Sequence, residues 1–246
     1  MLEPRSEYGL QQTESCALRK PGETCTRCGV RLFSICAALE HEDLIRLDRL
    51  AKHVEVAGKS ALFEQGEPAH HVYNVVHGTV RLFRLLPDGR RQIVGFALPG
   101  DFLGLSLADT HAYGAEAIDD AELCQFDRAQ MSQFADDNPH LMHRLHEFIS
   151  HELVIAQDQM VILGRLHAEE RIAVFLLNMY ERYGKIGRKS VTLPLPMLRA
   201  DIADYLGLTV ETVSRTISRL ARDKVILVVP DGVRILDMER LKALSG

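Results

Sequence analysis

The chain has 246 residues, 46% of them hydrophobic, which is enough to give two domains a core each. No stretch approaches about 18 consecutive apolar residues, and the first residues carry no basic-then-apolar signal pattern, so we expect a cytoplasmic protein without a membrane segment. The net charge of −5 is uneven: residues 165–246 hold 14 Lys and Arg against 10 Asp and Glu, so any nucleic-acid surface is expected there.

Four of the five cysteines lie in the first 36 residues of the chain. Cys25 and Cys28 are two residues apart, Cys36 follows, and the surrounding residues are too polar to form a core alone. Thiolates are soft ligands, so in a chain without an export signal this spacing predicts zinc or an iron–sulfur cluster rather than disulfides. A fourth ligand would be Cys16 or Cys124, although on chemistry alone Cys124 is equally well explained as an inert buried thiol.

The next part of the chain predicts a β domain. Leucines at 39, 44, 47 and 50 indicate a short amphipathic helix, after which the pattern changes to a period of two. Short alternating runs over 71–76, 79–83 and 92–96, separated by glycine turns, predict a barrel or jelly roll from about Val54 to Phe126. Residues 127–136 indicate a connecting helix.

A long amphipathic helix is predicted from Pro139 to His167. Its apolar residues recur close to every 3.5 positions: Leu145, Phe148, Ile149, Ile155, Ile162, Leu163 and Leu166. Such a seam favours pairing with a second copy, although a core helix of a monomer shows a similar stripe. Polar or small residues weaken a seam while fixing its register. The predicted dimer interface is Leu145, Ile149, Glu152, Ala156, Gln159 and Leu163.

The most specific motif lies near the C-terminus. A helix over 168–184 is followed by a helix over 197–206, a turn at Gly207-Leu208 and a second helix over 210–222, which Thr209 can cap. This is the helix-turn-helix pattern, whose second helix enters the major groove of DNA. Strand-like runs over 225–229 and 233–236, joined by a turn at 230–232, predict the wing of a winged version.

Four side chains of the second helix share one exposed face, namely Glu211, Ser214, Arg215 and Arg219. Glu can accept a hydrogen bond from cytosine N4, and Arg can make a bidentate contact with guanine. Together with Thr209 these are the candidate DNA contacts. The alternatives are that Glu211 only complements the helix dipole and that Arg215 pairs with Glu211 or with Asp201.

The segment Gly207–Arg215, behind a glycine-punctuated β roll and a long helix, resembles the CRP/FNR superfamily of bacterial transcription regulators. The resemblance covers nearly the whole chain and implies an α+β fold without enzymatic activity. It divides the chain into a cysteine-rich segment (1–38), a cyclic-nucleotide-binding-like β roll (39–138), a dimerisation helix (139–167) and a winged helix-turn-helix domain (168–246). The Glu-x-x-Ser-Arg pattern is similar to that of the FNR branch, which implies a TTGAT-N4-ATCAA palindrome.

The resemblance also gives the cysteines a role. FNR proteins hold an oxygen-labile [4Fe-4S] cluster with three N-terminal cysteines and one from the roll, which implies Cys25, Cys28, Cys36 and Cys124 as ligands and leaves Cys16 spare. The spacing Cys-x2-Cys-x7-Cys resembles that of the α-proteobacterial FnrL/FnrN type. The implied function is an oxygen-responsive regulator of anaerobic or microaerobic genes. Structural zinc on the same cysteines is the alternative, and a redox enzyme using Cys25 and Cys28 is disfavoured because no dinucleotide loop appears.

Further expectations follow from the same resemblance. They are a homodimer, contact with RNA polymerase through Asp88, Gly89 and Arg90, and no cyclic nucleotide, since Ala112-Tyr113-Gly114-Ala115 lacks the arginine of the CRP pocket. FixK-like regulators share the reading helix but are expected to lack the N-terminal cysteine group. Ala156 stands at about the place where the family often has an acidic residue that separates monomers, so we expect a dimer that persists in air.

Overall fold

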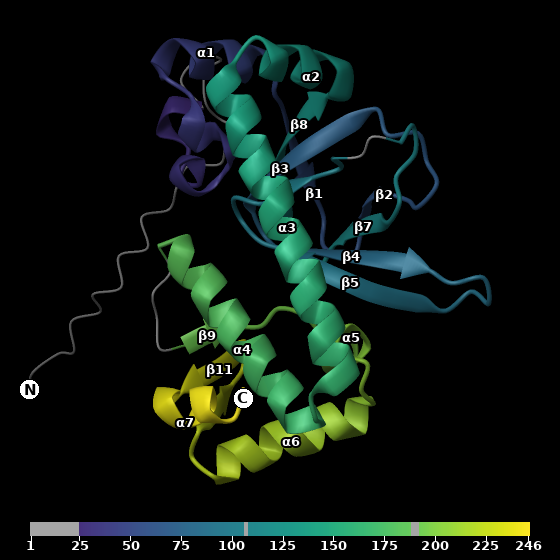
Figure 1. Ribbon diagram of the computed structural model, residues 1–246, viewed down its shortest axis with the longest axis vertical. Coiled ribbons are helices and arrows are strands. Elements are labelled where there is room, and N and C mark those ends of the chain that lie inside the picture. The colour runs from purple at the N-terminus through teal and green to yellow at the C-terminus, as the bar shows by residue number, and fades with distance from the viewer. Residues whose placement is uncertain (1–24, 106–107, 188–191) are drawn as a thin grey trace, which may run out of the picture.

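The computed structural model describes residues 25–105, 108–187 and 192–246. The long helix α3 (Pro139–Arg165) runs beside a β roll, and a second, mainly helical half lies at its C-terminal end (Figure 1). The predicted α+β class is therefore confirmed. None of the described helices is long and apolar enough to cross a membrane.

The cysteine-bearing segment consists of short turns packed on helices. Its 3-10 helices are η2 (Cys25–Arg27), η3 (Arg31–Phe33) and η4 (Ile35–Ala38). They precede α1 (His41–Leu50), in which Leu44 and Leu47 are fully buried. η2 contacts α1 and η4 contacts α3, so the segment is ordered by its neighbours and not by a core of its own, as its composition predicted.

Eight short strands form two antiparallel sheets, which make the roll (Figure 1). One sheet has the order β1-β8-β3-β6 and the other β2-β7-β4-β5. The strand bounds are β1 Lys52–Val56, β2 Ala61–Phe63, β3 His71–His77, β4 Val80–Leu85, β5 Arg91–Ala97, β6 Phe102–Leu103, β7 Gly114–Ala117 and β8 Ala121–Asp127. The turn before β4 passes so close to β8 that a side chain on Gly78 (φ +82°) would lie 2.6 Å from the Asp120 carbonyl oxygen, so glycine is required there.

Two helices lead from the roll to the C-terminal half. Asp127 caps α2 (Arg128–Asp136) by accepting a hydrogen bond from the Gln130 amide at 3.0 Å. Pro139 then starts α3, since proline suits the first helical turn.

The C-terminal half is a winged helix-turn-helix. Its elements are α4 (Ala168–Lys185), β9 (Thr192–Pro194), α5 (Arg199–Leu206), α6 (Val210–Arg222), β10 (Ile226–Val229), β11 (Gly232–Ile235) and α7 (Met238–Ala243). The wing is a three-stranded sheet of order β10-β11-β9. Sequence analysis did not predict β9 or α7, because three-residue and six-residue elements are too short to show a period.

One of the hydrophobic clusters crosses from the roll into the C-terminal half. It contains Phe83, Ile93, Phe96 and Leu98 of the roll together with buried residues of α4, α5 and α6. The C-terminal half is therefore packed directly against β4 and β5, in addition to being joined to the roll through α3.

Candidate functional site

The reading helix α6 turns one face inward and the other to solvent. Val213, Ile217 and Leu220 are buried under α4 and α5, which fixes the helix in its domain. Gly207 ends α5 in the left-handed conformation (φ +61°), and the Thr209 hydroxyl caps α6 by accepting a hydrogen bond from the Thr212 amide at 3.2 Å. The predicted helix-turn-helix geometry is thus present residue by residue.

All four predicted reading side chains lie on the exposed face of α6: Glu211, Ser214, Arg215 and Arg219. Hydrogen bonds from its own backbone N–H and from the Thr209 hydroxyl lower the pKa of Glu211, so its carboxylate is ionised and can accept a hydrogen bond. Arg219 forms an ion pair with Glu169 of α4, which holds it at the side of the face.

The outer face of α6 also carries residues that the sequence pattern did not single out. A shallow hollow of about 540 Å³ is lined by Thr212, Ser214, Arg215, Thr216, Ser218, Arg219 and Arg222. Ser218 and Arg222 therefore belong to the same surface as the predicted contacts. Their four-residue spacing, which repeats the Ser214–Ser218 step, was the signal available in the sequence.

The four predicted cysteine ligands in the described residues lie in one region of the molecule. Cys25 and Cys124 are both buried in the cluster that joins the N-terminal segment, the roll and α3, and Cys36 packs against that cluster. Cys28 is near enough to Cys36 to influence its pKa. Cys16 lies outside the described residues. Among the described residues, no three His, Cys, Asp or Glu side chains converge closely enough to hold a single metal ion.

Burial makes two of these thiols, those of Cys25 and Cys36, weaker acids. It raises the pKa of Cys36 to about 11 and raises that of Cys25 further, with the Cys36 sulfur and the Asp48 carboxylate adding to the effect. A thiol is a ligand only as the thiolate, so binding of a metal or cluster must release protons from this site.

Two further residues, Asp48 and His53, link the cysteines and were missed by the sequence analysis. The Sγ atom of Cys124 lies 3.6 Å from Nδ1 of His53, and Nε2 of His53 lies 3.8 Å from Oδ1 of Asp48. Asp48 is buried and hydrogen-bonds with Cys25. His53 pairs with Cys124 across β1 and β8, a contact between residues 71 positions apart that no local pattern can indicate.

Helix α3 has an apolar face that the described chain leaves uncovered. Ile149, Leu153, Met160 and Leu163 are 50%, 58%, 68% and 39% exposed, and Ala156 is exposed among them. Their spacing of four, three, four and three residues is a heptad seam, which is the pattern of helix pairing. Leu153 and Met160 were absent from the predicted interface.

The other predicted interface residues lie beside elements of their own chain, although Glu152 is exposed. Leu145 is buried in the cluster that contains Cys25 and Cys124. Glu152 borders a cavity of about 280 Å³ between α3 and the roll, and the Gln159 side-chain N–H donates to the Tyr205 carbonyl of α5 at 2.9 Å. Of the seven apolar residues proposed as the seam, Ile149 and Leu163 are exposed, whereas Leu145 and Ile162 are buried.

The turn proposed as a polymerase contact is exposed. It joins β4 and β5, which project from the roll (Figure 1). Asp88 accepts hydrogen bonds from the Arg90 backbone N–H at 3.1 Å and from Arg90 Nε at 2.7 Å, and these bonds lower the pKa of Asp88. The turn thus presents a fixed pair of opposite charges to solvent.

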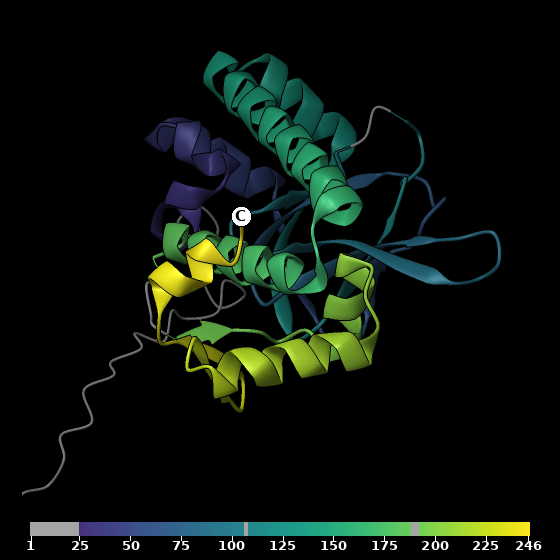
Figure 2. The same cartoon turned by 60° about the horizontal axis from the view of Figure 1, so that its bottom comes forward.

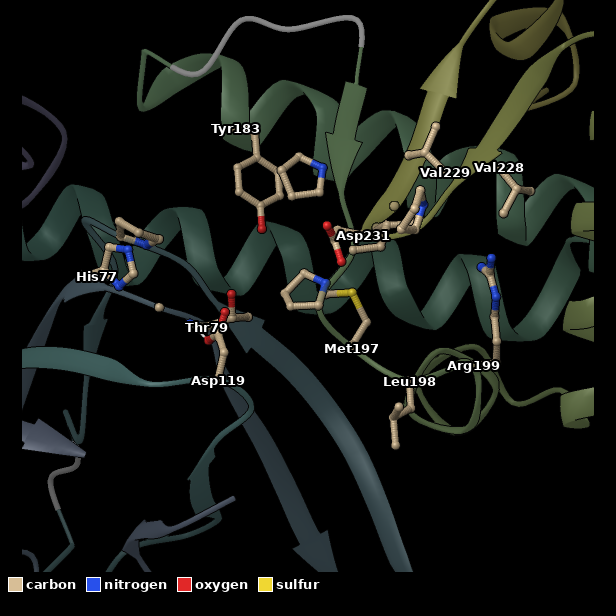
Figure 3. A pocket seen from close by; sticks show the side chains of 17 residues that line it. His77, Thr79, Asp119, Tyr183, Met197, Leu198, Arg199, Val228, Val229 and Asp231 are labelled. Carbon is tan, nitrogen blue, oxygen red and sulfur yellow. Dashed lines mark hydrogen bonds between the residues drawn. The ribbon is translucent and has the colours of Figure 1, made fainter. Parts of the chain in front are cut away.

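A cleft of about 620 Å³ lies between the roll and the wing (Figure 3). Thr79 and Asp119 border it from the roll, Asp231 and Val228 from the wing, and Arg199 from the start of α5. The two halves are therefore not packed together over their whole junction.

Comparison with known proteins gives two domain matches. Residues 170–244 match the Crp-like helix-turn-helix domain, and residues 53–138 match the cyclic nucleotide-binding domain. The matched segments coincide with the reading domain and with the roll.

Three similar proteins extend over most of the chain. The transcriptional activatory protein AadR of Rhodopseudomonas palustris is 46% identical, covering 93% of this chain and 98% of its own. The nitrogen fixation regulation protein FixK of Bradyrhizobium diazoefficiens is 44% identical, covering 92% and 95%. The solved structure of FixK2 from Bradyrhizobium japonicum has a TM-score of 0.74 at 38% identity, covering 80% of this chain and 98% of its own. A FixK protein is thus among the most similar relatives, although the cysteine pattern had set FixK-like regulators apart.

Proposed function

Because the chain belongs to the CRP/FNR family of DNA-binding transcription regulators, we propose that it couples DNA binding to oxygen through an iron–sulfur cluster. Members of the family bind DNA and are typically dimeric; they are not enzymes. The proposed regulator controls anaerobic or microaerobic genes. The observation that carries the proposal is the gathering of Cys25, Cys28, Cys36 and Cys124 from two distant parts of the chain into one buried region.

The donor set suits a [4Fe-4S] cluster. Such a cluster takes four cysteine thiolates, one on each of four irons, so its ligands spread wider than those of a single zinc ion. Three ligands on short turns of the N-terminal segment and one on a strand would join the segment to the roll. When bound, the cluster supplies a centre that oxygen oxidises, and this gives the protein its chemical signal.

The residues around the cysteines connect this site to the dimer helix. η4, which carries Cys36, packs on α3, and Leu145 of α3 lies in the same hydrophobic cluster as Cys25 and Cys124. Ligation would hold the segment against the N-terminal half of α3, whereas its loss would free the segment. A difference of about 1.4 kcal/mol in this packing shifts a dimer equilibrium tenfold.

In the proposed dimer, α3 pairs with α3 of a second copy through its exposed heptad seam. Twofold symmetry then places two α6 helices for the two halves of a palindrome such as TTGAT-N4-ATCAA. Glu211, Ser214 and Arg215 would contact base edges, and Arg219 would contact the backbone. The exposed turn at Asp88, Gly89 and Arg90 would contact RNA polymerase when the regulator activates transcription.

The test is anaerobic purification followed by a visible absorption spectrum with iron, sulfide and zinc analysis, repeated after exposure to air. We expect a brown protein with about four iron and four sulfide per chain, whose absorption changes in air. Cys124→Ser should remove the colour, and Cys16→Ser should keep it. A colourless protein that contains zinc and does not change in air would support the structural-zinc alternative and refute the oxygen response.

A further inference from the structure

The first helix of the helix-turn-helix, α5, is bound at both ends by groups from outside the reading domain. It is only eight residues long and lies below β4 and β5 of the roll (Figure 1). α5 packs directly on α6, so whatever holds α5 also sets the direction of the reading helix.

A buried charge network holds the N-terminal end of α5. Asp201 is buried and accepts the Leu198 backbone N–H at 3.1 Å, which caps the helix, while its other oxygen accepts from Nη1 of Arg81 at 2.8 Å. Arg81 also donates to Glu116 of the roll at 2.5 Å. Arg91 of β5 joins the network, 3.3 Å from Glu116 and 3.7 Å from Asp201. The Arg81 and Asp201 side chains are 13% and 5% exposed, so solvent screens their attraction little.

The C-terminal end of α5 is captured by hydrogen bonds from three other elements. The last carbonyls of a helix lack partners within it and must find them elsewhere. Here the Asp204 carbonyl accepts from the Gln92 side chain of β5 at 2.6 Å, the Tyr205 carbonyl from Gln159 of α3 at 2.9 Å, and the Leu206 carbonyl from Arg171 of α4 at 2.8 Å.

The roll makes one further bond to the same helix. The Asp204 carboxylate accepts from the Ile93 backbone N–H at 2.9 Å, so the edge of β5 and the flank of α5 are joined at two points. Elsewhere the cleft of Figure 3 separates the roll from the wing. The angle between the roll and the reading domain is therefore restricted by the polar bonds to α5 and not by contacts across this cleft.

The contacts between the roll and α5 leave the exposed face of α6 uncovered by the described chain. Glu211, Ser214 and Arg215 are exposed, and α6 lies on the outside of the molecule (Figure 2). A contact that kept the protein inactive by covering this face would show these side chains buried.

We propose that Arg81 of the roll and Asp201 of α5 are positioning residues for DNA reading, which hold each reading domain at the angle that a two-half-site operator requires. The proposal depends on DNA binding by a dimer and not on the cluster. Two reading helices must reach half-sites one helical turn apart at the same time, so the second contact is effectively intramolecular and depends on geometry. A single half-site places no such demand on the angle.

The test compares Arg81→Gln with Arg84→Gln, an exposed arginine on the same strand. The probes are a duplex that the wild-type protein selects from a randomised pool and the same duplex with one half-site scrambled. Arg81→Gln should bind the full duplex about tenfold more weakly and the half-site duplex about equally well. Arg84→Gln should match the wild type on both, and Arg81→Lys should recover part of the loss.

A second variant covers the case in which Arg81→Gln fails to fold. Gln92→Ala removes an uncharged hydrogen bond to α5 and leaves the Arg81–Asp201 pair in place. It should lower the affinity for the full duplex about threefold and leave the affinity for the half-site duplex about equal to that of the wild type. Equal losses on both duplexes would mean a general structural defect and would overturn the proposal. Unchanged or tighter binding of the full duplex would also overturn it. The bonds between the roll and α5 would then not hold the reading domain at the angle that DNA binding requires.

Discussion

At the scale of single residues, the two arginines of the α6 face differ in their surroundings. Arg215 is exposed, whereas Arg219 is paired with Glu169 of α4. We therefore expect Arg215 to reach a base edge and Arg219 to contact the DNA backbone.

Arg215→Ala should lower affinity for the selected duplex by about 10-fold to 100-fold, because a bidentate arginine–guanine contact contributes about 1–3 kcal/mol of discrimination. Binding to duplexes changed at that base pair should fall much less. Arg219→Ala should weaken binding to all duplexes by a similar factor. Titrations against duplexes with single base changes measure both effects, and a uniform loss for Arg215→Ala would contradict its role in base reading.

His111 is a buried imidazole in the roll. It is 5% exposed and stacks on Phe63 with ring centroids 3.8 Å apart. Burial lowers the pKa of His111, with Arg128, His70 and His71 lowering it further and Glu67 opposing them. The folded state therefore favours the neutral ring.

The free energy of unfolding should consequently fall as the pH drops below about 6.5, where the unfolded chain binds this proton more readily than the folded chain. His111→Phe keeps the stacking and removes the titration, so its Tm should fall by about 2 °C less than that of the wild type between pH 7 and pH 5. The exposed His140→Gln serves as control and should retain the wild-type pH dependence. Thermal unfolding at pH 7 and pH 5 measures the difference. An equal fall in Tm for the wild type and His111→Phe would contradict a role of His111 in the pH dependence.

At the scale of elements, α3 presents different faces to its own chain and to solvent. Ala156 lies at the centre of the exposed seam, between Leu153 and Met160. A carboxylate there would meet its copy in a twofold pair, where like charges repel in an apolar seam.

Ala156→Asp should weaken the dimer by at least about tenfold, a change of 1.4 kcal/mol or more. His151→Asp adds the same charge on an exposed position two residues from Leu153, on the opposite side of the helix, and should leave the dimer unchanged. Sedimentation analysis of the metal-free proteins in air measures both. A wild-type protein that is already monomeric at micromolar concentration would contradict the predicted persistence of the dimer.

The N-terminal segment rests on a glycine of the roll. A side chain on Gly100 (φ +98°) would lie 3.3 Å from Cβ of Phe33 in η3, whereas one on Gly66 (φ +88°) would meet no atom within 4 Å. Both positions favour glycine for backbone reasons, so Gly66→Ala is a matched control for strain alone.

Both alanine variants should lose about 1 kcal/mol or more of stability from the left-handed backbone. Only Gly100→Ala should speed hydrogen exchange in residues 25–38, because only this methyl group presses against the segment. Mass spectrometry of exchanging peptides measures the difference. Equal exchange in both variants would mean that Phe33 does not dock the segment on this turn.

At the scale of the whole molecule, the roll and the reading domain share a core. Phe96 of β5, Phe175 of α4 and Tyr205 of α5 form an aromatic group, with ring centroids 5.4 to 6.2 Å apart. Unfolding of either half would expose this group, so we expect one cooperative transition.

Phe96→Ala should reduce stability by about 3–5 kcal/mol and split the calorimetric transition in two, because it removes the ring that packs on both Phe175 and Tyr205. Phe126→Ala removes a buried ring of similar size from the cluster around the cysteines and should lower Tm without splitting the transition. A single transition in Phe96→Ala would show that the remaining contacts couple the halves without it.

The sequence by itself determined the longer elements and two candidate chemical surfaces. The period of α6 separates its buried from its exposed residues, the glycine turns mark the strands of the roll, and the spacing of Cys25, Cys28 and Cys36 predicts that they are ligands. These signals are local, since neighbouring side chains along one helix or turn share their surroundings.

Only the tertiary structure decided which element packs against each face of a helix or strand. Gln159 resembles a seam position in the sequence, yet its side chain bonds to α5, and the exposed Glu152 borders a cavity beside the roll. The Asp48–His53–Cys124 contacts and the Arg81–Asp201 pair join residues far apart in the chain. A hydrophobic period predicts that a face of an element is buried, but it does not identify the element that packs on that face. The packing partner is determined only when the chain has folded.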